Sequence, residues 1–182
     1  MRPDDITRAT EPVFAHNPWL QVYLDDVVVG GLPSQRLRLV ESGGVPGVVI
    51  LPLRGAHVGM VRQYRVVLGE DVWELPRGFG EAADPVQDAS RELAEETGLA
   101  AASWVSLGTV LPNSGLSAGA VRLFLARVGQ TRDLDAMDDE VDTFAWWPVS
   151  RLRAAIEADE IRDGFTLAAF LRADLRGLLP KD

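Results

Sequence analysis

The pattern of apolar and polar positions predicts a chain built of many short strands and a few helices. Apolar runs bounded by Gly, Pro and Ser indicate strands at residues 20–29, 35–41, 47–53, 58–65, 73–75, 103–111, 121–127 and 141–147. Helices are expected at residues 85–97, 150–159 and 165–175. Residues 1–12 show neither pattern and are expected to be irregular. Turns are expected at residues 30–34 and at residues 54–56, which would close a hairpin.

This order of elements predicts an α/β fold in which helices pack on the faces of a mixed sheet. The chain has 182 residues, which is long enough to bury a real hydrophobic core. Its strand-rich start sets the N-terminus apart. We therefore expect an N-terminal antiparallel β-region at residues 1–45 and an α/β domain at residues 46–182.

Three carboxylates on one predicted helix are the most informative feature of the chain. Asp84 is a preferred N-cap and is followed by Pro, which suits the first helical position. Gly98 is well placed to end the helix in the left-handed conformation. On such a helix Glu92, Glu95 and Glu96 are related by three and four positions, so they crowd one face.

Carboxylates at this spacing repel one another, and the neighbouring Arg91 alone does not compensate three of them. A hard divalent cation such as Mg²⁺ or Mn²⁺ would compensate their charge, because it prefers carboxylate oxygens. The alternative interpretation is a solvated acidic face, which is the usual role of a charge run. The preceding segment favours the metal site.

That segment reads Trp-Glu-Leu-Pro-Arg-Gly-Phe-Gly-Glu at residues 73–81, a short strand entering a Gly-rich loop. Strand, loop and acidic helix together resemble the signature of the Nudix hydrolases, G-x5-E-x7-R-E-U-x-E-E-x-G-U, in which U is aliphatic. Residues 91–99 match every fixed position of its second half. The resemblance therefore favours a catalytic helix over a solvated face.

The first half of the signature departs from the family pattern. Counting back from Arg91 places the family's Glu on Ala83 and its first Gly on Arg77. A deletion of one residue in the loop would instead align the Gly with Gly78 and let Asp84 stand in for the Glu.

The resemblance extends to one branch of the family, the ADP-ribose and nucleotide-sugar pyrophosphatases. Segments typical of that branch occur here in the same order, at residues 17–20, 61–65 and 146–148. This implies a Nudix-type α/β/α sandwich preceded by the N-terminal region, whose strands exchange between two subunits in that branch and imply a homodimer. The branch often carries Ser-Pro-Gly where this chain has Asn-Ser-Gly at residues 113–115.

The resemblance also implies the chemistry of the site. Nudix enzymes hydrolyse a diphosphate linked to a second group, and metal ions neutralise the anion and activate water. By this resemblance Glu92, Glu95 and Glu96 hold Mg²⁺ or Mn²⁺, assisted by a backbone carbonyl of Arg77 or Gly78.

A further acidic group is expected from outside the helix, because one helix face cannot surround a metal ion. Register with the family's late acidic loop places a further metal-binding residue at Asp139 or Glu140. The family's separate loop base falls near Met137, so Asp138 would take that role after a small shift. We take Asp138 and Glu140 as catalytic candidates and Asp139 as a metal candidate; a solvated turn is the alternative.

Three arginines are candidates for binding the substrate. Arg62, Arg65 and Arg77 can reach diphosphate oxygens with forked hydrogen bonds. An ion pair, for example with Glu74, is the alternative for the first two. Two aromatic residues are candidates to stack on a base, with core packing as the alternative: Trp19 and Tyr23.

Composition narrows the classes of function. A net charge of −9 argues against a nucleic-acid-binding surface, which should be basic. The chain has no Cys, and its N-terminus lacks the basic-then-apolar pattern of a signal peptide, so we expect a cytoplasmic protein. No apolar run approaches the ~20 residues that span a bilayer.

The expected function is metal-dependent cleavage of the diphosphate of ADP-ribose or a nucleotide sugar, giving a nucleoside monophosphate and a sugar phosphate. One alternative is a Nudix enzyme acting on another nucleoside diphosphate-linked compound, a nucleoside triphosphate or a dinucleoside polyphosphate. Another is a catalytically weak nucleotide-binding regulator, which the shortened loop favours and the three retained carboxylates disfavour.

Overall fold

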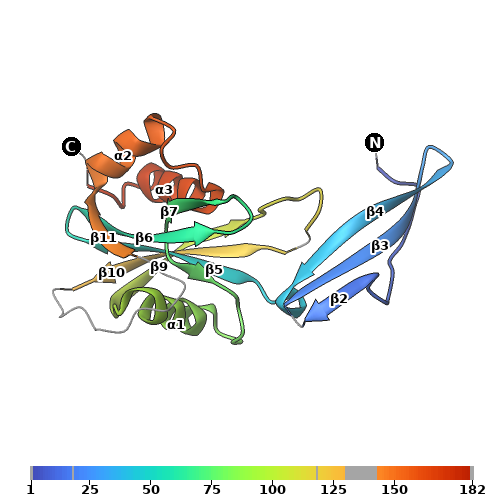
Figure 1. Ribbon diagram of the computed structural model, residues 1–182, viewed down its shortest axis with the longest axis horizontal. Coiled ribbons are helices and arrows are strands. Elements are labelled where there is room, and N and C mark those ends of the chain that lie inside the picture. The colour runs from blue at the N-terminus through green and yellow to red at the C-terminus, as the bar shows by residue number, and fades with distance from the viewer. Residues whose placement is uncertain (1, 18, 118, 130–142, 181–182) are drawn as a thin grey trace. The chain divides into compact units, whose positions relative to one another are not determined.

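The computed structural model describes residues 2–17, 19–117, 119–129 and 143–180 (Figure 1). Its chain forms two compact units, Met1–Pro46 with Leu111–Ala120 and Gly47–Val110 with Val121–Asp182. None of the helices described is long and apolar enough to cross a membrane.

The first unit contains a four-stranded antiparallel sheet. Its strands are β1 (Asp5–Thr7), β2 (Phe14–Asn17), β3 (Leu20–Val29) and β4 (Leu32–Glu41). The long β3 pairs with β4 along its whole length, and β1 and β2 also pair with it.

Two sequence predictions for this sheet are wrong. Residues 1–12 are not irregular throughout, because backbone pairing with β3 makes a strand of Asp5–Thr7. The turn is also shorter than residues 30–34, since β4 already begins at Leu32. Gly30 and Gly31 have φ of 60° and 76°, and two consecutive positive φ values allow a two-residue hairpin turn.

A buried carboxylate ties the start of the chain to this sheet. Asp25 on β3 is 4% exposed and accepts hydrogen bonds from the guanidinium of Arg38 at 2.7 and 2.9 Å. It also accepts from Arg8 at 3.2 Å and from the backbone N–H of Ala9 at 3.0 Å. The hydrogen bonds from Arg38 hold the pKa of Asp25 down at about 2, so this carboxylate stays ionised at neutral pH.

The second unit is built on a seven-stranded mixed sheet. Its strands are β5 (Gly47–Arg54), β6 (His57–Arg65), β7 (Glu70–Glu74), β8 (Arg77–Gly78), β9 (Ala101–Val110), β10 (Val121–Val128) and β11 (Thr143–Pro148). The pair β5–β10 is parallel, whereas β5–β6 is the predicted antiparallel hairpin. The short β8 pairs with β5 inside the loop that precedes the acidic helix.

Helices cover both faces of this sheet (Figure 1). They are α1 (Pro85–Thr97), α2 (Val149–Glu157) and α3 (Gly164–Leu175). Side chains alternate along β5, so Val49 and Leu51 join the core cluster of α2 and α3, while Val48 and Ile50 join that of α1. The predicted α/β/α sandwich with a mixed sheet is therefore confirmed.

Candidate active site

Helix α1 has the predicted bounds because its end signals are local. The carboxylate of Asp84 accepts from the N–H of Val86 at 3.0 Å, and Pro85 occupies the first turn. Gly98 ends the helix with φ of 67°, and its N–H donates to the carbonyl of Ala94 at 2.8 Å. Leu93 of this helix is fully buried against the sheet, so the helix is fixed in rotation.

The three carboxylates of α1 lie in two different environments. Glu92 and Glu96 are buried, with 8% and 6% of their surface exposed, whereas the Glu95 side chain is 47% exposed. Arg91 lies 2.8 Å from Glu92 and 2.8 Å from Glu95, so one guanidinium pairs with both. Arg91 therefore serves Glu92 and Glu95, and Glu96 has other partners.

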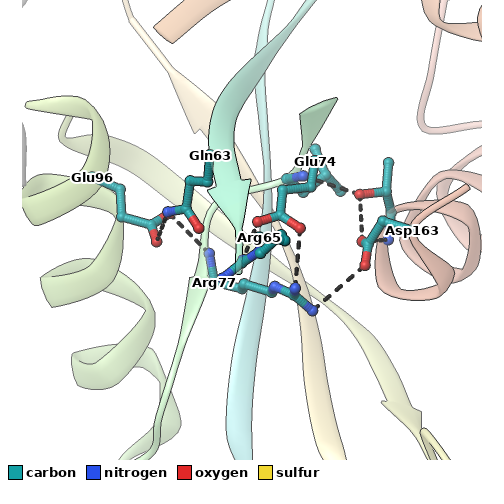
Figure 2. Close-up of polar contacts among 8 residues, drawn as sticks. Gln63, Arg65, Glu74, Arg77, Glu96 and Asp163 are labelled. Carbon is teal, nitrogen blue, oxygen red and sulfur yellow. Dashed lines mark hydrogen bonds and ion pairs between the residues drawn. The ribbon is translucent and has the colours of Figure 1, made fainter. Parts of the chain in front are cut away.

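Glu96 accepts hydrogen bonds from two N–H donors (Figure 2). Among the residues that the structure describes, no Arg or Lys side chain lies within ion-pair distance of it. The backbone N–H of Arg77 donates to its Oε2 at 3.0 Å, and Nε2 of Gln63 lies 3.3 Å from its Oε1. Burial raises the pKa of Glu96 to about 8, although the Arg77 N–H opposes the shift. Burial also raises the pKa of Glu92, with Arg91 opposing. Burial therefore penalises the charged form of both carboxylates.

Gly78 brings the loop backbone directly onto Glu92. A Cβ built on Gly78 would lie 2.0 Å from the carboxyl carbon of Glu92 and 2.1 Å from each of its oxygens. Only glycine permits this approach. The strand pairing of β8 with β5, in which Gly78 lies opposite Val48, holds the loop in that place.

These groups fit a hard divalent cation. Carboxylate oxygens with loop backbone beside them form the donor set that Mg²⁺ and Mn²⁺ prefer, and a cation would relieve the charge buried at Glu92 and Glu96. Within the described ranges, no three acidic or histidine side chains are close enough together to hold an ion by themselves. Asp138, Asp139 and Glu140 lie outside the residues that the structure describes.

The three candidate arginines all have acidic partners. Arg62 pairs with the exposed Asp71, and Arg65 pairs with Glu74, which was the alternative considered for it. Arg77 donates to the other oxygen of Glu74 at 3.0 Å (Figure 2). The structure thus brings Arg65 and Arg77 together on one carboxylate that is 2% exposed. Burial raises the pKa of Glu74, against the effect of both arginines.

The two candidate aromatic residues belong to the first unit. Trp19 lies in the turn between β2 and β3 and is 44% exposed. Tyr23 lies on β3, where its hydroxyl donates to Gln21 at 3.0 Å and the guanidinium of Arg38 lies 4.2 Å from the centroid of its ring. Tyr23 therefore has structural partners inside its own sheet.

Asp88 is an important residue that the sequence interpretation missed. It is 2% exposed, and its carboxylate accepts from the backbone N–H of Glu81 at 3.0 Å and from that of Ala82 at 3.0 and 3.2 Å. Arg91 adds a hydrogen bond to the carbonyl of Phe79 at 2.9 Å. These bonds hold the loop whose length departs from the family signature. The available signal was spacing, since Asp88 lies four residues before Glu92 and extends the acidic face by one turn.

Gln63 was missed as well. It lies at a buried position of β6, with 3% of its surface exposed, and its amide reaches Glu96. The signal for it was its position two residues after Val61, because alternate residues of a strand share a face and a buried amide needs a hydrogen-bond partner.

Comparison with known proteins identifies related chains. The family model described as NUDIX domain matches residues 44–168. An ADP-ribose pyrophosphatase of Mycobacterium tuberculosis is 33% identical over 149 residues, covering 78% of this chain and 69% of that protein. An ADP-ribose pyrophosphatase of Bacillus subtilis is 25% identical over 181 residues, covering 97% and 96%.

One further relative has a different described role, and one solved structure has a similar fold. A methanol dehydrogenase activator of Bacillus methanolicus is 27% identical over 142 residues, covering 78% of this chain and 75% of that protein. A crystal structure described as ADP compounds hydrolase superposes with a TM-score of 0.74 at 20% identity, covering 98% of both chains. At that identity the superposition shows the fold alone.

Proposed function

Because the chain belongs to the Nudix family, in its ADP-ribose pyrophosphatase branch, we propose that it hydrolyses the diphosphate of ADP-ribose or a nucleotide sugar with the help of a divalent metal ion. Water adds to one phosphorus and the bond from that phosphorus to the bridging oxygen breaks. The products are a nucleoside monophosphate and a sugar phosphate.

One observation carries the proposal: two buried carboxylates, Glu92 and Glu96, face a loop backbone brought close by Gly78. We propose that these residues and the more exposed Glu95 hold Mg²⁺ or Mn²⁺, with the backbone carbonyl of Arg77 or Gly78. When bound, the ion would neutralise the diphosphate and lower the pKa of a water molecule.

The remaining groups of the site position these carboxylates or complete the reaction. Arg91 pairs with Glu92 and Glu95, which orients both at the edge of the site. For the residues outside the described ranges we keep the proposal made from the sequence. Asp138 or Glu140 acts as the base and Asp139 as a further metal ligand.

Substrate recognition is proposed to follow the relatives, two of which are named ADP-ribose pyrophosphatases. Arg62 is partly exposed, and its pairing with the exposed Asp71 can exchange for a phosphate oxygen at little cost. Arg65 is less available because its partner Glu74 is buried. Trp19 and Tyr23 remain the residues proposed to stack on a base.

A competition assay tests the substrate. With Mg²⁺ or Mn²⁺ present, we expect kcat/KM for ADP-ribose or a nucleotide sugar to exceed that for nucleoside triphosphates by about tenfold or more. Identifying both products by chromatography establishes that cleavage occurs between the phosphates. A higher kcat/KM for triphosphates than for every diphosphate-linked sugar would show that this substrate assignment is wrong. No turnover of any compound in the panel would favour the regulator alternative.

We also propose a homodimer formed through the N-terminal strands. Leu20 of β3 and Leu37 of β4 lie on the same face of their sheet and are 37% and 52% exposed, so a partner sheet could cover both. Light scattering should give about twice the chain mass of 19.8 kDa. Leu37→Asp should shift the protein towards monomer, whereas Leu175→Asp, on the similarly exposed surface of α3, should not. A wild-type monomer at micromolar concentration would contradict the proposal.

We propose that the enzyme acts in the cytoplasm and binds neither nucleic acid nor membrane. The absence of Cys suits a reducing compartment, and the net charge of −9 disfavours binding to polyanions.

A further inference from the structure

Arg77 connects the buried carboxylate of Glu96 to the beginning of α3 (Figure 2). Its backbone N–H donates to Glu96 at 3.0 Å, and its guanidinium donates to Glu74 at 3.0 Å. The same guanidinium lies 3.5 Å from Oδ1 of Asp163 and 4.9 Å from the ring centroid of Phe165. One residue thus contacts α1 through its backbone and α3 through its side chain.

The anchor of Arg77 on α3 is itself fixed. Asp163 is the N-cap of α3, and its Oδ2 accepts from both the N–H and the hydroxyl of Thr166 at 2.8 Å. The hydroxyl oxygen of Thr166, which is fully buried, accepts from the backbone N–H of Leu75 at 3.0 Å. Leu75 lies two residues before Arg77, so these hydrogen bonds and the ion pair between Arg77 and Asp163 join the strand, the helix cap and the loop.

We propose that Arg77 is a positioning residue: its side chain, clamped by Glu74 and Asp163, fixes the loop backbone so that the N–H of residue 77 points at Glu96. The physical reason is the position next to Gly78. Pairing of Arg77 with Val49 on β5 already holds this short strand. Because glycine restrains the backbone least, the side-chain anchor of Arg77 adds a second restraint on the direction of its peptide. The inference rests on the proposed function, in which Glu96 holds the metal ion.

This role differs from the phosphate contact expected from the sequence. If Arg77 contacted phosphate, its substitution would weaken substrate binding and raise KM. A positioning role acts through Glu96, so its loss should weaken metal binding and lower kcat while KM stays nearly constant. A substitution of Asp163 distinguishes the two roles, because the side chain of Asp163 contacts Arg77 and Thr166 rather than the acidic face of α1.

The test uses Arg77→Ala and Asp163→Asn in the full-length protein. Asn is as good an N-cap as Asp, so Asp163→Asn keeps the start of α3 and removes only the charge facing Arg77. Calorimetry without substrate should show Mg²⁺ affinity reduced about fivefold to twentyfold in both variants. We expect kcat to fall by a similar factor and KM to stay within about twofold.

Arg153→Ala is the matched control. Arg153 pairs with Asp174 at 2.8 Å and lies 5.4 Å from the ring centroid of Phe170, so it combines an ion pair and a ring contact as Arg77 does. These bonds join α2 to α3. Mg²⁺ affinity and kcat should remain at the wild-type level in this variant.

Amide hydrogen exchange provides a readout that needs no metal ion. The N–H of residue 77 should exchange about tenfold faster in Asp163→Asn than in the wild type, because the peptide is no longer clamped. Unchanged exchange and unchanged Mg²⁺ affinity in Asp163→Asn would overturn the proposal, as would an Arg77→Ala variant whose only defect is a raised KM. A wild-type protein that binds no divalent ion would instead overturn the proposed function, and the exchange rates would still decide on the clamp.

Discussion

Glu96→Gln is expected to lower turnover by ~10² or more while leaving the fold intact. The substitution preserves the shape of the side chain, and its amide oxygen can still accept from the N–H of Arg77. It removes the negative charge that would hold the proposed metal ion. Steady-state kinetics over a range of Mg²⁺ and Mn²⁺ concentrations measures the effect.

The same substitution should stabilise the metal-free protein at alkaline pH. Burial raises the pKa of Glu96 from 4.5 to about 8, so the folded state favours the neutral acid. For an acid whose pKa is raised by folding, stability is highest below the unfolded pKa and falls as the pH rises from 4.5 to about 8. Gln cannot ionise and escapes this loss. In EDTA, the Tm of Glu96→Gln should exceed that of the wild type at pH above 8 but not near pH 4.

Glu157→Gln, the same chemical change on the exposed surface of α2, serves as the control and should alter neither activity nor Tm. Near-normal turnover of Glu96→Gln at every divalent ion concentration would remove Glu96 from the proposed metal site. Equal Tm values in EDTA at high pH would show that burial does not penalise its charge.

Gly78→Ala is expected to reduce kcat/KM by ~10² or more with a modest effect on stability. The new Cβ would lie 2.0–2.1 Å from the carboxyl group of Glu92, a distance that no packing tolerates. The atoms it meets are the end of a flexible side chain, so Glu92 can swing aside and the fold can survive. The carboxylate would then be displaced from the loop backbone.

A second substitution provides the control for this explanation. In the double variant Gly78→Ala/Glu92→Asp the carboxylate is shorter, so the clash is relieved and the two activity losses should be less than additive. Gly164→Ala, where a Cβ meets nothing within 4 Å, should retain wild-type activity. A fully active Gly78→Ala variant would show that the close approach of Glu92 to the loop is dispensable.

Much of the fold follows from local signals in the sequence. Helix α1 runs from Pro85 to Thr97 as predicted, because Asp84, the following Pro and Gly98 act within one turn of the helix ends. The β5–β6 hairpin likewise follows from two apolar runs around a short turn. The strand Asp5–Thr7 could not be predicted in this way, because it exists only through pairing with Val27 and its neighbours on β3.

The family of the chain also followed from the sequence, whereas the environment of each carboxylate did not. The spacing of Glu92, Glu95 and Glu96 and the neighbouring Gly-rich loop indicated a Nudix hydrolase, and the family model confirms it. Spacing along a helix specifies which side chains share a face, but not how deeply each is buried. The separation into two buried carboxylates and the exposed Glu95 depends on how the sheet and the loop pack against the helix.

Tertiary structure alone decided the partners of the charged residues. Asp88 binds the backbone of the shortened loop, which offers a physical account of how the chain tolerates its departure from the signature. Arg77, a candidate for phosphate binding from the sequence, contacts Glu74 and Asp163, and Asp163 lies far along the chain at the start of another helix. Capping and helical spacing act over about four residues, so a sequence reveals them directly. Ion pairs and buried contacts form between segments that only the folded sheet brings together, and this burial raises the pKa of Glu96.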